Sequence, residues 1–296
     1  MRPEVITVFG PTAAGKTAVA EALADELGTE VVSADAMQVY DGLPILTNQP
    51  QRATRLVAIW PLSHEGSVGE FQTLAHSAID DLVQENGTAV VTGGTGLYLR
   101  AAIADLDLPP ALGSEARARW ESAYDENARA AHAELESRDP AAATLVHPND
   151  RQRVVRALEL TEIGASLARP EDRLWSEETR RPTLSVGLEV PLPELERRID
   201  MRAQEMFERG VVEEVHSALG ADVSRTAEKA LGLREIAELP AEKARAKLVL
   251  RTRRYAAYQR KWMRRIPSIV MIDGGSASSR PAAEVADEIL EVARTR

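Results

Sequence analysis

The sequence predicts an α/β fold, in which a parallel sheet core with a phosphate-binding loop is flanked by helices and carries a helical insertion domain. Short apolar runs alternate with segments of helical periodicity towards both ends of the chain, as in parallel sheets with crossover helices. From about 107 to 182 this alternation stops, and residues 114–137 are rich in Ala, Glu and Arg. We therefore expect a first core segment over 1–106, an insertion over 107–182 and a second core segment over 183–296.

The composition limits the class of protein. The 296 residues carry a net charge of −10, and 44% of them are apolar, enough for a sizeable core. Cysteine is absent, which excludes disulfides and cysteine-ligated metal sites and fits a reducing compartment. We find no apolar segment long enough to span a bilayer and no signal peptide. We expect no membrane association, a cytoplasmic location and, by default, a monomer.

A glycine-rich loop follows the first predicted strand, residues 5–9, and precedes a helix-forming segment. The loop reads Gly10-Pro11-Thr12-Ala13-Ala14-Gly15-Lys16-Thr17. Strand, glycine loop, Lys-Thr and helix form the pattern of a phosphate-binding loop, whose backbone N–H groups and helix N-terminus hold phosphate oxygens. Lys16 adds a mobile cation, and the Thr17 hydroxyl suits Mg²⁺. The motif predicts a di- or triphosphate ligand, and its rival interpretation is a chance match in a strand–helix turn.

Asp35 follows the second predicted strand, residues 30–33. Ligands of open α/β sheets bind at the carboxyl ends of the strands, so we expect this carboxylate near the phosphate-binding loop. The expectation assumes that this strand runs beside the loop strand. A rival interpretation makes Asp35 the cap of the turn that follows.

A second glycine-rich turn follows a buried strand expected over 89–92. Residues 56–60 before it are a possible strand, and helical spacing predicts a helix over 70–86. The turn reads Gly93-Gly94-Thr95-Gly96, without the acid that commonly holds Mg²⁺ at such a strand end in P-loop NTPases. This missing acid argues against an ordinary ATP-hydrolysing protein. Close packing alone also explains the glycines.

Helices dominate the remainder of the chain. In the insertion we expect helices over 114–137, from 140, and from about 150 to near 164. In the second core segment we expect a strand over 183–190, helices over 193–209, 211–219, 226–238 and 241–265, and a strand over 268–272.

Positive charge is concentrated in two of these helices. From Lys243 to Arg265 the chain contains no acid, and aromatic residues are interleaved with the basic ones. Arg153 and Arg156 are three residues apart and share one face of an insertion helix. Such surfaces attract phosphate backbones. The alternatives are arginines that pair with acids elsewhere in the fold, and a solvated basic face.

Several stretches together resemble the tRNA dimethylallyltransferase family. They occur in the order typical of that family, at residues 10–17, 33–40, 93–98, 149–159, 198–202, 229–235 and 252–255. The resemblance implies that the loop holds dimethylallyl diphosphate, not ATP. It also implies that the prenyl group passes to the exocyclic N6 of the adenosine 3′ of a tRNA anticodon, with release of diphosphate. The adenine must then leave the anticodon stack.

The resemblance also implies roles for individual residues. Asp35 is the general base and Thr12 hydrogen-bonds the leaving oxygen, while Mg²⁺ is the cofactor, with Thr17 as its ligand. The expected diphosphate-binding residues are Gly10, Pro11, Thr12, Ala13, Ala14, Gly15, Lys16, Thr17 and Arg202. The expected tRNA-binding residues are Asp35, Ala36, Met37, Gln38, Thr95, Arg117, Gln152, Arg153, Val154, Val155 and Arg156.

The chain departs from the family pattern in four places. Ala36 stands where the family usually has Ser, residues 46–50 replace Gly-Thr-Ala-Lys-Pro, a histidine pair before Trp60 is absent, and residues 257–259 replace Lys-Arg-Gln. Three other functions stay open: a small-molecule kinase that uses ATP, a nucleotide-binding regulator that binds RNA without modifying it, and a prenyltransferase acting on free adenylate. The missing strand-end acid and the basic helix disfavour the kinase, and the helical insertion disfavours the free-adenylate enzyme.

Overall fold

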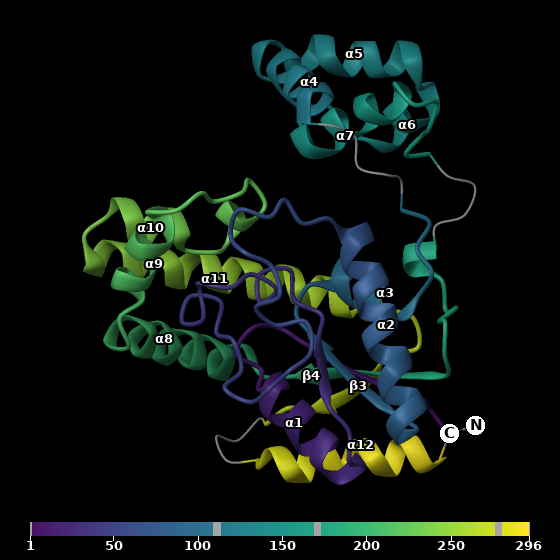
Figure 1. Ribbon diagram of the computed structural model, residues 1–296, viewed down its shortest axis with the longest axis vertical. Coiled ribbons are helices and arrows are strands. Elements are labelled where there is room, and N and C mark those ends of the chain that lie inside the picture. The colour runs from purple at the N-terminus through teal and green to yellow at the C-terminus, as the bar shows by residue number, and fades with distance from the viewer. Residues whose placement is uncertain (1, 109–113, 169–172, 276–279, 296) are drawn as a thin grey trace. The chain divides into compact units, whose positions relative to one another are not determined.

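The computed structural model describes residues 2–108, 114–168, 173–275 and 280–295 (Figure 1). A five-stranded sheet with the order β2-β3-β1-β4-β5 confirms the predicted α/β fold, and every strand pair is parallel. The strands are β1 (Val5–Phe9), β2 (Val31–Ser33), β3 (Ala89–Gly93), β4 (Thr183–Glu189) and β5 (Val270–Asp273).

The chain divides into two compact units. The first consists of Met1–Leu106 and Leu174–Arg296, and the second of Asp107–Arg173, so residues 174–182 group with the sheet. The first unit contains α1 (Lys16–Leu27), α2 (Val68–Asn86), α3 (Gly96–Ile103), α8 (Leu192–Glu208), α9 (Val211–Leu219), α10 (Leu233–Glu238), α11 (Ala241–Met263) and α12 (Ala282–Thr295). The second contains α4 (Ser114–Glu126), α5 (Ala128–Arg138), α6 (Pro140–Leu145) and α7 (Arg151–Thr161).

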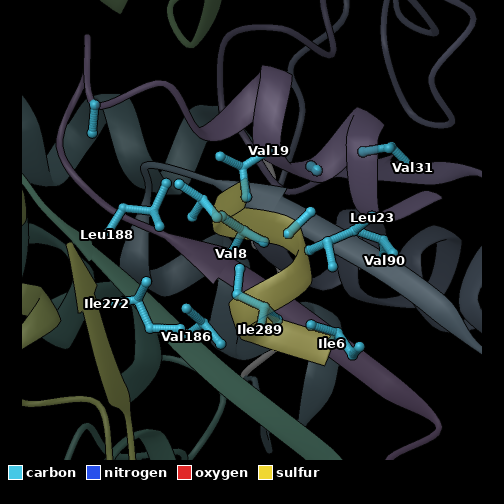
Figure 2. Close-up of a cluster of buried hydrophobic side chains, with 14 of the residues drawn as sticks. Ile6, Val8, Val19, Leu23, Val31, Val90, Val186, Leu188, Ile272 and Ile289 are labelled. Atoms are coloured by element: carbon cyan, nitrogen blue, oxygen red, sulfur yellow. The ribbon is translucent and has the colours of Figure 1, made fainter. Parts of the chain in front are cut away.

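The core of the first unit forms around β1, whose five residues are all buried. A strand covered on both faces requires such a continuous apolar run. Ile6 and Val8 pack with Leu23 of α1 and Ile289 of α12, as Figure 2 shows. The helices α1 and α12 lie side by side (Figure 1). This packing holds β1 rigidly, and with it the start of the glycine-rich loop.

Strand register brings three chain segments to one edge of the sheet. Phe9, the last residue of β1, is level with Gly93 of β3, and Ser33 of β2 is level with Thr92. The loop after β1, the turn after β3 and Asp35 after β2 therefore leave the sheet close together. The expectation that β2 runs beside β1 is wrong, because β3 lies between them.

Other expected elements also differ from the structure. Residues 56–60 form no strand, since Leu56 and Ala58 have positive φ angles and the segment makes a single isolated bridge, between Trp60 and Tyr40. The helix expected over 114–137 is divided at Asn127, whose side chain caps α5 by accepting a hydrogen bond from Ala130 N. The helix expected over 226–238 breaks at Gly232, which has a φ of 98°.

Two helices, α3 and α12, were not expected. The apolar residues of α12 recur with helical spacing, at Val285, Ala286, Ile289, Leu290 and Ala293, so the sequence carried that signal. In the described part of the chain, no helix combines the length and the apolar character that crossing a bilayer requires.

Candidate active site

A cavity of about 640 Å³ opens within the first unit at the carboxyl edge of the sheet. Its lining comes from the glycine-rich loop, from residues 35–38 and 46–48, from the second glycine turn, and from α8 and α11. These segments are far apart in the sequence. The strand register described above brings three of them together: the glycine-rich loop, the second glycine turn and the segment that begins at Asp35. The cavity is the natural place for the phosphate ligand that the loop predicts.

The glycine-rich loop is curled in the way that an anion site requires. Gly15 has a φ of 90°, which a residue without Cβ adopts at no steric cost, and Ala13 has a φ of 64°. The first residue of α1 is Lys16, so the unpaired N–H groups of its first turn point out of the helix end. Together with the helix dipole, these groups favour phosphate oxygens.

Two cationic side chains contact the first glycine-rich loop. Arg202 Nη1 donates a hydrogen bond of 2.9 Å to Thr12 Oγ1, and Lys16 Nζ donates one of 2.8 Å to the carbonyl oxygen of Pro11. Arg202 lies on α8, whose buried residues Leu195, Ile199, Ala203 and Met206 fix the face that the helix turns to the core. Of the predicted diphosphate-binding residues, six line the cavity: Thr12, Ala13, Gly15, Lys16, Thr17 and Arg202. Gly10, Pro11 and Ala14 are outside its lining, and Ala14 is buried in the core.

The electrostatics of the cavity follow from its enclosure. Removal from water lowers the pKa of Lys16 to about 8, an effect that Asp35 opposes and Arg202 reinforces. Burial also lowers the pKa of Arg202. Burial raises the pKa of Tyr255, on α11, to about 12, and the charge of Asp35 adds to that rise. Burial thus makes both positive charges energetically costly, and an anionic ligand would offset that cost.

Asp35 both caps a turn and faces the cavity. Its Oδ1 accepts hydrogen bonds from Met37 N at 2.9 Å and Gln38 N at 3.4 Å. The side chain lines the cavity, and no group in the described ranges donates to its Oδ2. Capping is therefore real, and it leaves one carboxylate oxygen available for chemistry.

The other predicted residues after β2 differ in their freedom. Ala36 and Met37 line the cavity. Gln38 lines it too, but other parts of the protein already bind its amide: Nε2 donates to Asn48 O at 2.8 Å, and Oε1 accepts from Ser33 Oγ of β2 at 2.9 Å. We infer that Gln38 shapes this wall of the cavity more than it contacts a ligand.

The second glycine turn is packed too closely to carry side chains. A Cβ on Gly93 would lie 2.2 Å from Ala34 O, and one on Gly94 would lie 2.3 Å from Gln259 Nε2. A Cβ on Gly96 would lie 2.1 Å from the Trp262 ring. The packing explanation of these glycines is therefore right. Thr95 in the same turn lines the cavity, with its hydroxyl 3.3 Å from that of Tyr255.

Comparison with known proteins decides the family. An IPP transferase family model matches residues 38–266, and an isopentenyl transferase model matches residues 3–57. The chain belongs to the IPP transferase family. The tRNA dimethylallyltransferase of Streptomyces coelicolor is 38% identical to it, over 98% of this chain and 96% of that protein. That of Thermobifida fusca is 37% identical, over 90% of this chain and 88% of its own length.

Solved structures of the family share the fold. A tRNA isopentenylpyrophosphate transferase from Bacillus halodurans is 28% identical with a TM-score of 0.68, over 99% of this chain and 98% of its own. A eukaryotic dimethylallyltransferase described as acting on tRNA is 25% identical with a TM-score of 0.77, over 97% of this chain and 79% of its own.

The predicted residues of the helical unit divide into two groups. Val154 and Val155 are buried in the core of that unit. Arg156 Nη1 lies 3.2 Å from Glu159 Oε2, and Arg117 Nη1 lies 3.9 Å from the same oxygen, while the Glu159 side chain is only 1% exposed. These arginines neutralise a buried carboxylate. Arg153 and Gln152 are exposed, and the described residues offer Arg153 no ion pair.

The basic helix α11 also contains both kinds of cation. Arg251 pairs with Glu235, and Arg253 pairs with Asp200 at 2.6 Å. Arg260 lies 3.9 Å from Glu189, so the pairing explanation holds for these three arginines. Seven other cations on this helix and just past its end are exposed, and the described part of the chain contains no acid paired with them: Lys243, Arg245, Lys247, Arg254, Lys261, Arg264 and Arg265, the last of which lies over the Trp175 ring. This set remains a positive surface.

Several residues that line the cavity lie outside the predicted set, among them Tyr255 and Gln259. Gln259 of α11 lines the cavity and is 3% exposed. The signal was present, because Gln259 keeps the Gln of the family's Lys-Arg-Gln although the two residues before it differ.

Proposed function

We propose that this chain transfers a dimethylallyl group from dimethylallyl diphosphate to N6 of the adenosine 3′ of the anticodon in tRNA. The observation that carries the proposal is the convergence of Thr12, Lys16, Arg202 and Asp35 on one cavity in a member of the IPP transferase family. Its relatives are named tRNA dimethylallyltransferase, and a structural neighbour is described as acting on tRNA.

The cationic side of the cavity suits the leaving group. When the bond between the allylic carbon and its oxygen breaks, negative charge grows on diphosphate. Groups fixed before the reaction stabilise such charge with little reorganisation. Here the loop N–H groups, Lys16 and Arg202 would bind the diphosphate, and the Thr12 hydroxyl, already oriented by Arg202, would donate to the bridging oxygen.

Asp35 and the apolar wall account for the other half of the reaction. The Oδ2 of Asp35, to which no described residue donates, is suited to accept the proton that the adenine amine loses as the new carbon–nitrogen bond forms. Apolar side chains from several elements line the same cavity and suit a five-carbon prenyl group: Met37, Leu46, Met206, Leu231 and Leu248. Because an exocyclic amine is a weak nucleophile, holding it against the allylic carbon supplies much of the rate.

The residues present fit a Mg²⁺ ion bound mainly through the substrate. Thr17 lines the cavity, and no hydrogen bond within the described residues uses its hydroxyl. Those residues contain no cluster of three His, Asp or Glu side chains able to hold a metal. Mg²⁺ commonly binds one or two protein oxygens together with phosphate oxygens and water. Thr17 would hold it there, and the ion would neutralise part of the diphosphate charge.

The direct test is incubation with dimethylallyl diphosphate, Mg²⁺ and unmodified tRNA, followed by mass analysis of the nucleosides. We expect a prenylated adenosine 3′ of the anticodon, and none in a tRNA that carries guanosine at that position. Phosphate transfer from ATP, with no prenylation, would contradict the proposal and favour the kinase.

We also propose that the chain acts as a monomer in the cytoplasm. One chain supplies all the groups named here, and sedimentation tests whether it is a monomer.

We expect the loop to prefer dimethylallyl diphosphate over ATP. The strand β3 ends in glycines and supplies no acid for a nucleotide-bound metal, whereas the apolar lining fits a prenyl chain. The measurement is displacement of labelled dimethylallyl diphosphate by each unlabelled compound at equilibrium, with inorganic diphosphate as the control for the loop alone. A clear preference for ATP would contradict this assignment.

We propose that exposed cations of the helical unit and of α11 bind the tRNA backbone. Arg153→Gln is then expected to weaken tRNA binding and to lower the slope of affinity against salt by about one, with an unchanged melting temperature. Arg129→Gln, which removes an exposed arginine of α5 outside the predicted set, is the matched control. An equal loss of tRNA affinity in both variants would show that Arg153 contributes only to the overall positive charge. Unchanged affinity in Arg153→Gln would show that Arg153 belongs to a solvated face that does not bind tRNA.

Arg156→Gln is expected to behave differently from Arg153→Gln. It leaves the buried Glu159 with a weaker partner, so we expect a loss of about 2 kcal/mol in the stability of the chain. Thermal unfolding measured beside tRNA binding separates the two effects. Full stability of the Arg156 variant with weakened tRNA binding would show that Arg156, too, acts on the tRNA.

A further inference from the structure

Gln259 joins the two glycine-rich segments of the cavity through its side-chain amide. Its Oε1 accepts a hydrogen bond of 2.8 Å from Thr12 N in the first loop, and its Nε2 donates one of 2.8 Å to Gly94 O in the second turn. Gln259 is 247 residues from Thr12 and 165 from Gly94 in the sequence. Its side chain thus links α11 to two segments that are both distant from it along the chain.

The chemistry of the two partners requires an amide at this position. One partner is a backbone N–H and the other a backbone C=O, so only one orientation of the Gln259 amide satisfies both. A carboxylate could accept from Thr12 but could not donate to Gly94, and a lysine or arginine could only donate. Methionine has nearly the same length and makes neither bond.

The surroundings leave Gln259 little freedom. Its side chain is almost fully buried, and the absence of a side chain on Gly94 creates the space for its Nε2. Three residues further along α11, Trp262 packs over Gly96 in the same turn. Because the helix is fixed against this turn at two points, the position of the amide is fixed as well.

Thr12 is consequently held from two sides. Gln259 fixes its backbone N–H, and Arg202 fixes its side-chain oxygen at 2.9 Å. A backbone amide that is already bonded to Gln259 is not free to bind diphosphate, unlike the N–H groups at the start of α1. The contribution of Thr12 to the reaction then lies in its hydroxyl, whose position depends on how the peptide is oriented.

We propose that Gln259 is a positioning residue for prenyl transfer, which sets the place of the Thr12 hydroxyl by holding its backbone amide against the second glycine turn. The inference rests on the proposed function, since it concerns the same site. It adds a residue that does not touch the reacting atoms and acts through Thr12. Displacing a catalytic group by about 1 Å commonly costs about 100-fold in rate, which sets the expected size of the effect.

The variant Gln259→Met tests this with matched controls. We expect single-turnover transfer to fall about 100-fold, while tRNA and inorganic diphosphate bind within about threefold of the parent. Gln204→Met makes the same change at an exposed site on α8, where Glu208 is the one hydrogen-bond partner of the amide among the described residues, and is expected to be silent. Near-normal transfer by Gln259→Met would overturn the inference, as would a loss confined to tRNA binding.

A cycle with Thr12→Ala distinguishes positioning from general support of the fold. If Gln259 acts through the Thr12 hydroxyl, Gln259→Met is expected to cost little more once that hydroxyl is gone. If Gln259 only supports the fold, the two losses multiply, and this result would overturn the inference. Should the methionine variant melt below the assay temperature, Gln259→Asn replaces it, because an amide one methylene shorter cannot reach both partners.

Hydrogen exchange at the Thr12 amide reports on the bond without any turnover. We expect this amide to be protected in the parent and exposed to exchange in Gln259→Met, and an unprotected amide in the parent would overturn the inference. A parent chain that transfers no prenyl group would instead contradict the proposed function, and the inference would fall with it. If the parent is active and the rate losses of Gln259→Met and Thr12→Ala multiply, the inference about Gln259 is overturned while the proposed function stands.

Discussion

Lys16→Ala is expected to lower the rate of prenyl transfer by about 100-fold or more, with tRNA binding nearly unchanged. The Lys16 ammonium lies in the cavity beside the first turn of α1, where diphosphate charge would develop. Removing one fixed donor of this kind typically costs 10²–10³ in rate. Single-turnover transfer and tRNA affinity are the measurements, and activity within a few-fold of the parent would show that the loop is not the reaction site.

The same side chain gives the site a pH dependence. Lys16 has a pKa of about 8 in the folded chain, below its ordinary value of 10.5. The ammonium is therefore lost as the pH rises through about 8, and diphosphate affinity is expected to fall there in the parent. The Lys16→Ala variant should lack this part of the decline.

Stability should respond in the opposite direction. A lowered pKa means that the folded chain binds fewer protons than the unfolded chain between about 8 and 10.5, so folding gains stability as the pH rises through this window. Below it, the protonated side chain opposes folding. Lys16→Ala is thus expected to melt no lower than the parent at pH 7, a sign that this residue is kept for binding.

The elements of the sheet were predictable because their signals are local. The continuous apolar run of β1, the Gly-Lys-Thr pattern after it and the helical spacing of α2 can each be recognised within a short stretch of sequence. Parallel strands also bring their carboxyl ends to one edge, so the general position of the site follows from the fold class.

What escaped prediction depends on contacts between distant residues. The place of β3 between β1 and β2 is set by strand pairing, which no local pattern encodes. The bonds of Gln259 join segments 247 and 165 residues apart. Arg153 and Arg156 are indistinguishable as sequence, yet only Arg156 faces the buried Glu159. The charge of a side chain can be read from the sequence, but its partner cannot.

Asp35 lines the cavity although its strand, β2, does not lie beside the loop strand, β1. The carboxylate was expected near the loop because β2 was placed beside β1, and that placement is wrong. It reaches the cavity all the same, because Gly93 at the end of β3 lets the chain after β2 approach closely: Ala34 O occupies the space that a Cβ on Gly93 would need. The bonds of its Oδ1 also leave both interpretations of Asp35 standing, as cap and as base.

Asparagine at this position separates cap from base. An asparagine keeps an oxygen for Met37 N and Gln38 N, so it can cap the turn, but it cannot accept a proton. Two comparisons frame the result. Asp35→Ala removes the cap as well and is expected to be less stable than Asp35→Asn. Asp41→Asn makes the same change at an exposed turn residue, whose Oδ1 accepts from Gly42 N at 2.7 Å, and should be silent.

We expect Asp35→Asn to leave folding and tRNA binding nearly intact and to lower prenyl transfer by roughly 10²–10⁴-fold. The reason is that the amine must lose its proton as the carbon–nitrogen bond forms, and Oδ2 of Asp35 is a cavity-facing oxygen to which no group in the described ranges donates. Single-turnover transfer is measured beside the melting temperature. Near-normal transfer by the Asn variant would remove Asp35 from the chemistry and leave it as a cap. If the melting temperature of the Asn variant fell as well, the loss of transfer would be explained by impaired folding.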